Sequence, residues 1–223
     1  MTNEMGLFFS AIAFVGLHFL LSHPLRDPLV RAVGEGPFRG IYALLALLTF
    51  GTMIHYYSAI GDEPQLYVAN DAVWVAASLL MWFGSILFVG SFIGNPALPG
   101  ARVKAGARPG GVFAITRHPM MWGFAIWAIV HLVVVAMPKS LVFDGAILLL
   151  ELAGSAGQDA KKRKLMGERW HEWVAHTAFI PFARGVASPG AVALIGGTLL
   201  FFIATWAHGA IGGMPAGFWR WIG

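Results

Sequence analysis

Six apolar stretches, each about as long as a membrane-spanning helix, constrain this chain more than any other feature of its sequence. A helix needs ~20 predominantly apolar residues to cross the hydrocarbon core of a bilayer. The stretches that meet this requirement are residues 5–21, 38–57, 72–93, 119–137, 141–157 and 191–208. Composition agrees, because 57% of the 223 residues are hydrophobic and only 12% are charged. The sequence therefore predicts one all-α integral membrane domain over residues 1–223 and argues against a water-soluble enzyme.

The basic residues predict how these spans are oriented. Thirteen of the 15 Lys and Arg residues lie in or directly beside the first, third and fifth connecting loops, whereas the second loop has none and the fourth has only Lys139. Basic loops stay on the cytoplasmic side of a membrane. We therefore expect a multi-pass protein of the bacterial cytoplasmic membrane with both termini periplasmic. The net charge of +4 is attributed to contact with membrane lipids rather than to nucleic acid.

The fifth loop contains a segment with both basic and aromatic residues. Residues Asp159–His176 predict an interfacial amphipathic helix on the inner leaflet. His171, Glu172 and His176 also lie in this segment, but the two histidines are five residues apart. A zinc protease needs the HExxH spacing, which places both histidines on one helix face. The spacing therefore argues against a zinc site.

Histidines are the principal candidates for binding a metal, because the chain has no cysteine and eight histidines. His118 stands at the start of the fourth span, between Arg117 and Pro119, and His18 lies inside the first span. Each taken alone fits an interfacial anchor or a hydrogen-bonded structural histidine as well as a ligand. Taken together, two imidazoles on different helices, an apolar slot and nearby arginines are what a b-type haem requires.

Two further ionisable residues lie within the spans and have no assigned role. Glu151 is a carboxylate well inside the fifth span, where it suits a proton relay, an acceptor for a histidine N–H or a structural partner. His131 follows Trp122 and Trp127 along the fourth span, which is more typical of packing than of cofactor contact.

Three segments of the chain resemble the NnrU family, whose relatives include plant 15-cis-ζ-carotene isomerase. The matching segments are His18–Tyr42, Gly110–Leu132 with its RHP element, and Gln158–Phe182. The resemblance implies an integral membrane protein that binds haem b through two histidines. It places the ligands at His18 and His118, with His23 as a competing ligand. Three arginines are candidates to balance the haem propionates: Arg117, Arg26 and Arg39.

The function expected from the resemblance is that of a membrane haem b protein linked to nitrogen-oxide metabolism in denitrification. Its bis-histidine iron would open one position for a small ligand such as nitric oxide. One alternative is a haem-dependent cis–trans isomerase of a carotenoid-like polyene. Another is an adenosylmethionine-dependent membrane methyltransferase, because the RHP element is shared with that class, although Trp122 here replaces its tyrosine. Whether the chain is catalytic stays open at this point.

Overall fold

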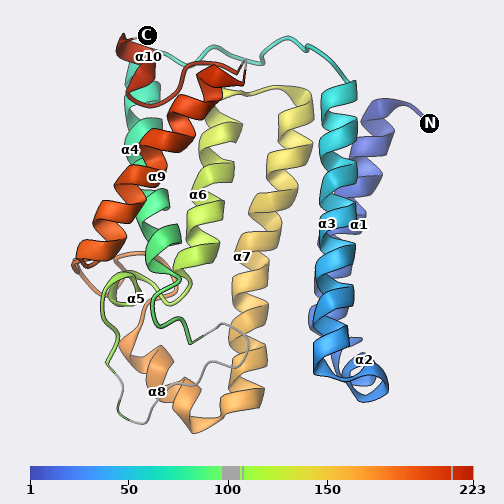
Figure 1. Cartoon of the computed structure of the whole chain (residues 1–223), viewed down its shortest axis with the longest axis vertical. Coiled ribbons are helices and arrows are strands. Elements are labelled where there is room, and N and C mark those ends of the chain that lie inside the picture. The colour runs from blue at the N-terminus through green and yellow to red at the C-terminus, as the bar shows by residue number, and fades with distance from the viewer. Residues whose placement is uncertain (97–105, 107, 212, 223) are drawn as a thin grey trace. The chain divides into compact units, whose positions relative to one another are not determined.

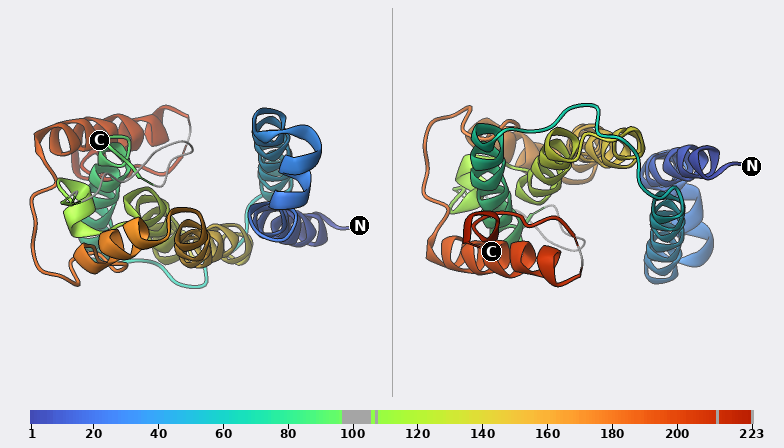
Figure 2. Two further views of the ribbon diagram at one scale, coloured as in Figure 1. Left: turned by 90° about the horizontal axis from the view of Figure 1, so that it is seen from below. Right: turned by 90° about the horizontal axis from the view of Figure 1, so that it is seen from above.

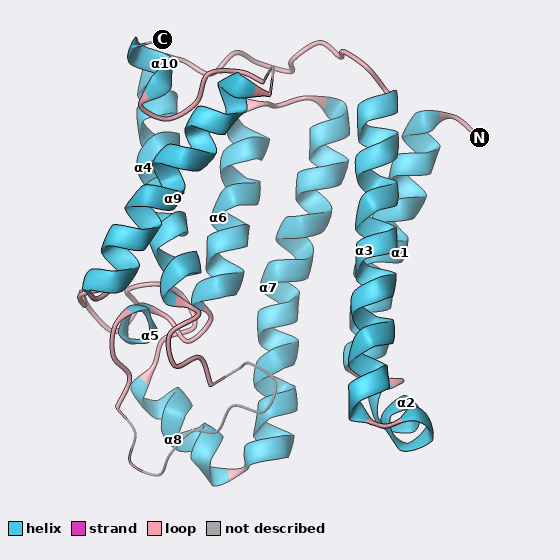
Figure 3. Ribbon diagram, in the orientation of Figure 1, coloured by secondary structure: helices cyan, strands magenta, loops and turns pink. Residues whose placement is uncertain are grey.

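All regular elements are helices in the part of the chain that the computed structural model describes, residues 1–96, 106, 108–211 and 213–222 (Figures 1 and 3). They are α1 (Asn3–Ser22), α2 (Arg26–Val33), α3 (Glu35–Ala59), α4 (Asp71–Gly90), α5 (Val112–Ile115), α6 (Pro119–Val134), α7 (Pro138–Met166), α8 (Glu168–His176), α9 (Ala191–Ala210) and α10 (Trp219–Ile222). The predicted all-α class is confirmed.

The long helices occur at the predicted membrane spans. Five of the described helices, α1, α3, α4, α7 and α9, are long and apolar enough to cross a membrane. The apolar helix α6 has 16 residues, which is ~24 Å at a rise of 1.5 Å per residue. Apart from α7, each of these helices begins and ends within three residues of its predicted stretch. The chain is therefore a multi-pass helical membrane protein.

The described residues form two compact units. Unit 1 comprises residues 1–68 and 131–157, and unit 2 comprises residues 69–130 and 158–223. In unit 1, α1 and α3 lie side by side and antiparallel (Figures 1 and 2). The Asn3 side chain donates to Ala59 O at one end of the pair, and the Ser22 and Tyr42 hydroxyls are 3.2 Å apart at the other.

The part of α7 in unit 1 packs against α3 through aromatic and hydroxyl contacts. The Tyr57 and Ser140 hydroxyls are 3.0 Å apart, and the Phe50 and Phe143 ring centroids are 5.8 Å apart. Such interhelical contacts are favourable in lipid, where burial of apolar surface does not drive helices together. These contacts hold α7 against α3 within unit 1.

Glycines let α4 approach two neighbouring helices of unit 2 closely. A Cβ atom placed on Gly123 of α6 would lie 3.0 Å from Gly84 O of α4. A Cβ atom placed on Gly197 of α9 would lie 2.7 Å from Ile86 N of α4. Small residues at crossings bring backbones together and increase van der Waals contact in a membrane. The α4 helix is therefore the element against which both α6 and α9 are fixed.

The prediction of a single helix over Asp159–His176 is wrong about where that helix begins. Residues 159–166 continue α7, and α8 begins only at Glu168, after Gly167 with φ 55°. Lysine and arginine are good helix formers, so the helix continues past the apolar stretch that was used to predict its end. Trp170 and Trp173 of α8 are both buried. The first loop also contains a helix that was not predicted, α2.

We expect Gly197→Ala to destabilise the protein by about 1–3 kcal/mol, because the new methyl group would overlap backbone atoms of α4. Gly209→Ala in the same helix is the matched control, since a Cβ atom there has no neighbour within 4 Å. Thermal unfolding in detergent, followed by circular dichroism, measures both. Equal unfolding temperatures for the two variants would contradict the close crossing of α4 and α9.

Candidate functional site

The centre of the candidate site is His118, which stands at the junction between α5 and α6 in unit 2. Thr116 ends α5 in an extended conformation, and Pro119 begins α6. Proline suits the first helical turn because its missing N–H has no partner there. The His118 residue is 2% exposed. The sequence pattern therefore fixes where α6 begins and places this imidazole in the interior.

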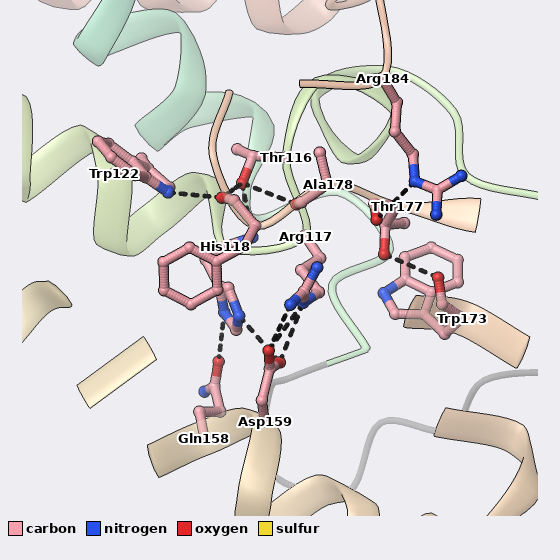
Figure 4. A network of polar contacts seen from close by, with 11 residues as sticks. Thr116, Arg117, His118, Trp122, Gln158, Asp159, Trp173, Thr177, Ala178 and Arg184 are labelled. Atoms are coloured by element: carbon pink, nitrogen blue, oxygen red, sulfur yellow. Dashed lines mark hydrogen bonds and ion pairs between the residues drawn. The ribbon is translucent and has the colours of Figure 1, made fainter. Parts of the chain in front are cut away.

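Both ring nitrogens of His118 face polar side chains in the C-terminal third of α7 (Figure 4). Nδ1 lies 3.2 Å from Gln158 Oε1, and Nε2 lies 2.9 Å from Asp159 Oδ1. Nε2 and Asp159 Oδ1 form an ion pair when the ring is protonated, so the carboxylate occupies the space beside this nitrogen. The His118 ring is thus held by two neighbouring side chains of α7.

Arg117 binds Asp159 in a buried, bidentate ion pair. Its Nε donates to the two carboxylate oxygens at 3.1 and 2.9 Å, and its Nη2 donates to Oδ2 at 2.6 Å. Both side chains are 11% exposed. Fork-to-carboxylate pairing of this kind is strong and fixes orientation. The charge of Arg117 is thus compensated by α7, and the Asp159 carboxylate is shared between Arg117 and Nε2 of His118.

A third segment, residues 177–179, is tied to the same junction. The Thr116 hydroxyl donates to Phe179 O at 2.7 Å, Trp122 Nε1 donates to the same oxygen at 2.8 Å, and Arg117 N donates to Ala178 O at 2.8 Å. The Phe179 ring contacts His118 edge-on, with centroids 5.1 Å apart. Figure 4 shows Ala178 on one side of this junction and Gln158 and Asp159 of α7 on the other. Trp122 therefore faces protein rather than lipid at its indole nitrogen.

His18 occupies a different setting, in unit 1. Its Nδ1 donates to Phe14 O at 2.6 Å, and its ring lies edge-on to Phe14 and Tyr42. A carbonyl oxygen only accepts, so Nδ1 carries the proton and Nε2 keeps its lone pair. His23 is exposed at the C-terminal cap of α1. Its Nε2 lies 2.5 Å from the place where a Cβ atom of Gly157 would be.

The other two arginines predicted for the site share one carboxylate in unit 1. Arg26 Nη2 donates to both oxygens of Glu35 at 3.0 Å, and Arg39 Nε donates to Oε1 at 3.2 Å. Arg26 also lies 3.4 Å from the exposed Asp27. Arg26 and Arg39 thus lie together around Glu35, and Arg117 and His118 lie together around Asp159. These groups belong to different units, as do His18 and His118.

The remaining ionisable candidates do not form a metal site among the described residues, where no group of three or more His, Asp or Glu could hold an ion. His171 Nδ1 lies 3.8 Å from Glu168 Oε2, and His176 Nδ1 lies 2.8 Å from the backbone oxygen of Glu172. Glu151 has one buried carboxylate oxygen without a hydrogen-bond partner. The prediction against zinc at His171 and His176 stays a prediction, and the role of Glu151 stays open.

Gln158 and Asp159 are the residues that sequence reasoning missed as partners of His118. They lie 40 and 41 residues further along the chain, so no local pattern connects them to the RHP element. The sequence did mark these two residues as candidates for the site. They are polar, they directly follow an apolar stretch, and they begin the third segment of the family resemblance. The structure brings the second and third of those segments together in unit 2.

Comparison with known proteins agrees with the resemblance noted in the sequence. The family model described as NnrU protein matches residues 6–216. The chain is similar to 15-cis-zeta-carotene isomerase, chloroplastic, from Arabidopsis thaliana, at 25% identity over 81% of this chain and 50% of the relative. The Zea mays protein of the same description is 25% identical over 82% of this chain and 50% of its own length. This chain thus spans about half the length of these relatives. No solved structure gives a significant match.

We expect Asp159→Asn to destabilise unit 2 by about 3–5 kcal/mol, because it leaves the Arg117 charge buried without a partner. Arg39→Ala breaks an exposed ion pair with Glu35 and should cost less than about 1 kcal/mol. Thermal unfolding in detergent compares the two. The double variant Arg117→Met with Asp159→Leu should recover much of the loss, and an Asp159→Asn variant as stable as the parent protein would contradict the buried pair.

Proposed function

The chain belongs to the NnrU family, and we propose that it is a membrane isomerase that converts a cis double bond of a carotenoid-like polyene to trans. The names of its plant relatives support this substrate class. A polyene is apolar and partitions into the bilayer, where the described helices lie. The relatives favour isomerisation over the expected role in nitrogen-oxide metabolism, which stays a prediction.

We propose that haem b is the cofactor and that His118 and His18 hold its iron. The observation that carries this proposal is the tautomer of His18, whose Nδ1 donates to Phe14 O and so leaves the lone pair on Nε2. Coordination to a metal would use that lone pair. The His18 ring therefore fits the Nε2 ligation that haem iron accepts from histidine. At His118, Nε2 lies 2.9 Å from Asp159 Oδ1, so binding of iron at this nitrogen would require the carboxylate to move aside.

The charged residues around these histidines support particular roles in holding the group. Arg26 and Arg39 both contact the carboxylate of Glu35, and Arg26 also contacts Asp27, so the half-exposed guanidinium of Arg39 is the better candidate to bind a propionate. Arg117 is neutralised by Asp159 and serves mainly to fix the residue next to His118. When bound, the haem would supply an iron centre whose oxidation state and ligation can change, while these side chains hold and orient it.

Conversion of 15-cis-ζ-carotene in the dark by detergent-purified protein tests the activity, with products separated by chromatography. We expect the parent protein to convert the substrate and to carry a Soret band. His118→Ala and His18→Ala should lose both, because each removes an iron ligand. His171→Ala, which alters a half-exposed histidine of α8, is the matched control and should retain both.

A second variant of His118 distinguishes loss of the iron ligand from unfolding of the protein. His118→Gly with added imidazole should regain the Soret band, because the free base replaces the missing ring. Conversion by protein that contains no haem would contradict the cofactor, and bound haem without conversion would contradict the substrate. Binding of nitric oxide with no conversion would favour the nitrogen-oxide function instead.

We further propose that the protein lies in a bacterial cytoplasmic membrane with its termini on the periplasmic side. The distribution of basic residues among the loops supports this orientation. Alkaline phosphatase fused after residue 223 should be active, because that enzyme needs the periplasm to form its disulfides. A fusion in the second loop should be active and one in the third loop inactive. The opposite pattern would overturn the orientation.

A further inference from the structure

Glu151 is a carboxyl group in the membrane that the proposed function does not use. It lies near the middle of α7, in the part of this helix that belongs to unit 1. Its Oε2 atom is buried and forms no hydrogen bond in the part of the chain that the structure describes. None of the ion pairs between described residues involves it. An ionised carboxylate is strongly unfavourable there, because neither water nor a cation compensates its charge. The position therefore favours the neutral acid, which carries one proton.

Two hydroxyl groups of unit 1 connect the surroundings of Glu151 to the end of α1. The Glu151 carboxyl lies close enough to Tyr42 of α3 to act electrostatically on its hydroxyl. That hydroxyl is 3.2 Å from the hydroxyl of Ser22, and either of the two can be the donor. Ser22 is the last residue of α1 and directly precedes the exposed His23. Because a hydroxyl both donates and accepts, these groups can pass a proton in either direction.

We propose that Glu151 is a proton-binding site inside the membrane, loaded from the end of α1 through Ser22 and Tyr42. Ser22 accepts a proton from water and gives its own to the Tyr42 oxygen, and Tyr42 gives its own to the Glu151 carboxylate. Each hydroxyl gains one proton and loses one, so only the carboxylate changes charge. The ring of His18 also faces this route, edge-on to Tyr42, but its Nδ1 proton is donated to Phe14 O. No step involves the proposed haem.

Infrared spectroscopy of the purified protein at neutral pH tests the state of Glu151. A protonated carboxylic acid has a C=O stretching band that an ionised carboxylate lacks. We expect this band in the parent protein and a loss of its intensity in Glu151→Gln, because the amide replaces the acid. Glu168→Gln is the matched control and should leave the band unchanged, since the Glu168 side chain is 85% exposed and its carboxylate is ionised in water.

Transfer into D2O tests the route. Deuteration shifts the acid band to lower frequency, so the exchange of the Glu151 proton can be followed in time. Tyr42→Phe and Ser22→Ala each remove one hydroxyl and should slow this exchange several-fold while the band keeps its intensity. Tyr56→Phe is the matched control, because it removes a hydroxyl near the other end of the same helix. It should exchange at the parental rate.

The possible outcomes distinguish the site from the route. A band of equal intensity in the parent protein and in Glu151→Gln overturns the proton-binding site. Glutamine has the size of the neutral acid, so Glu151→Gln should also unfold at the parental temperature. Failure of this variant to fold would indicate a required negative charge and would likewise overturn the site. Equal exchange rates in the parent protein, Tyr42→Phe and Ser22→Ala overturn the route.

Discussion

The buried ion pair between Arg117 and Asp159 is the interaction on which the arrangement around His118 depends. It connects the residue before His118 to the C-terminal third of α7, and it places the neighbouring Gln158 within reach of the ring. Removal of two charges from water is unfavourable unless the pair is well aligned and fully hydrogen-bonded. Here the guanidinium meets both carboxylate oxygens, and the Arg117 backbone N–H donates to Ala178 O. Three segments distant in sequence are thereby held at one point.

The close helix crossings of unit 2 complement this polar connection. Gly84 faces Gly123 where α4 meets α6, the helix that begins directly after His118. The crossing fixes α6 along its length, and the ion pair fixes its first turn. Apolar packing alone would leave the rotation of the Arg117–His118 segment undetermined, whereas polar contacts alone would not hold the helix. The two kinds of contact together define where the imidazole lies.

Much of the fold was predictable because the bilayer imposes a length on apolar helices. The start of α6 at Pro119 was predictable for a local reason, because proline suits the first helical turn. The end of α7 was not, because helix propensity continues through Lys161–Lys164 after hydrophobicity stops. At the site, Arg117 and His118 were identified, but Gln158 and Asp159 were not recognised as their partners. That pairing is a long-range contact, and nothing in the local pattern around either segment specifies it.

The 29 residues of α7 have a consequence for the depth at which the imidazole is held. A helix of this size is ~43 Å long, which exceeds the ~30 Å hydrocarbon thickness of a typical bilayer. Tilting or local thickening of the lipid must accommodate the excess, or the charged end must project into the headgroup zone. Gln158 and Asp159 directly precede the charged residues of α7, so a change in acyl-chain length can alter the surroundings of the site without any change in sequence.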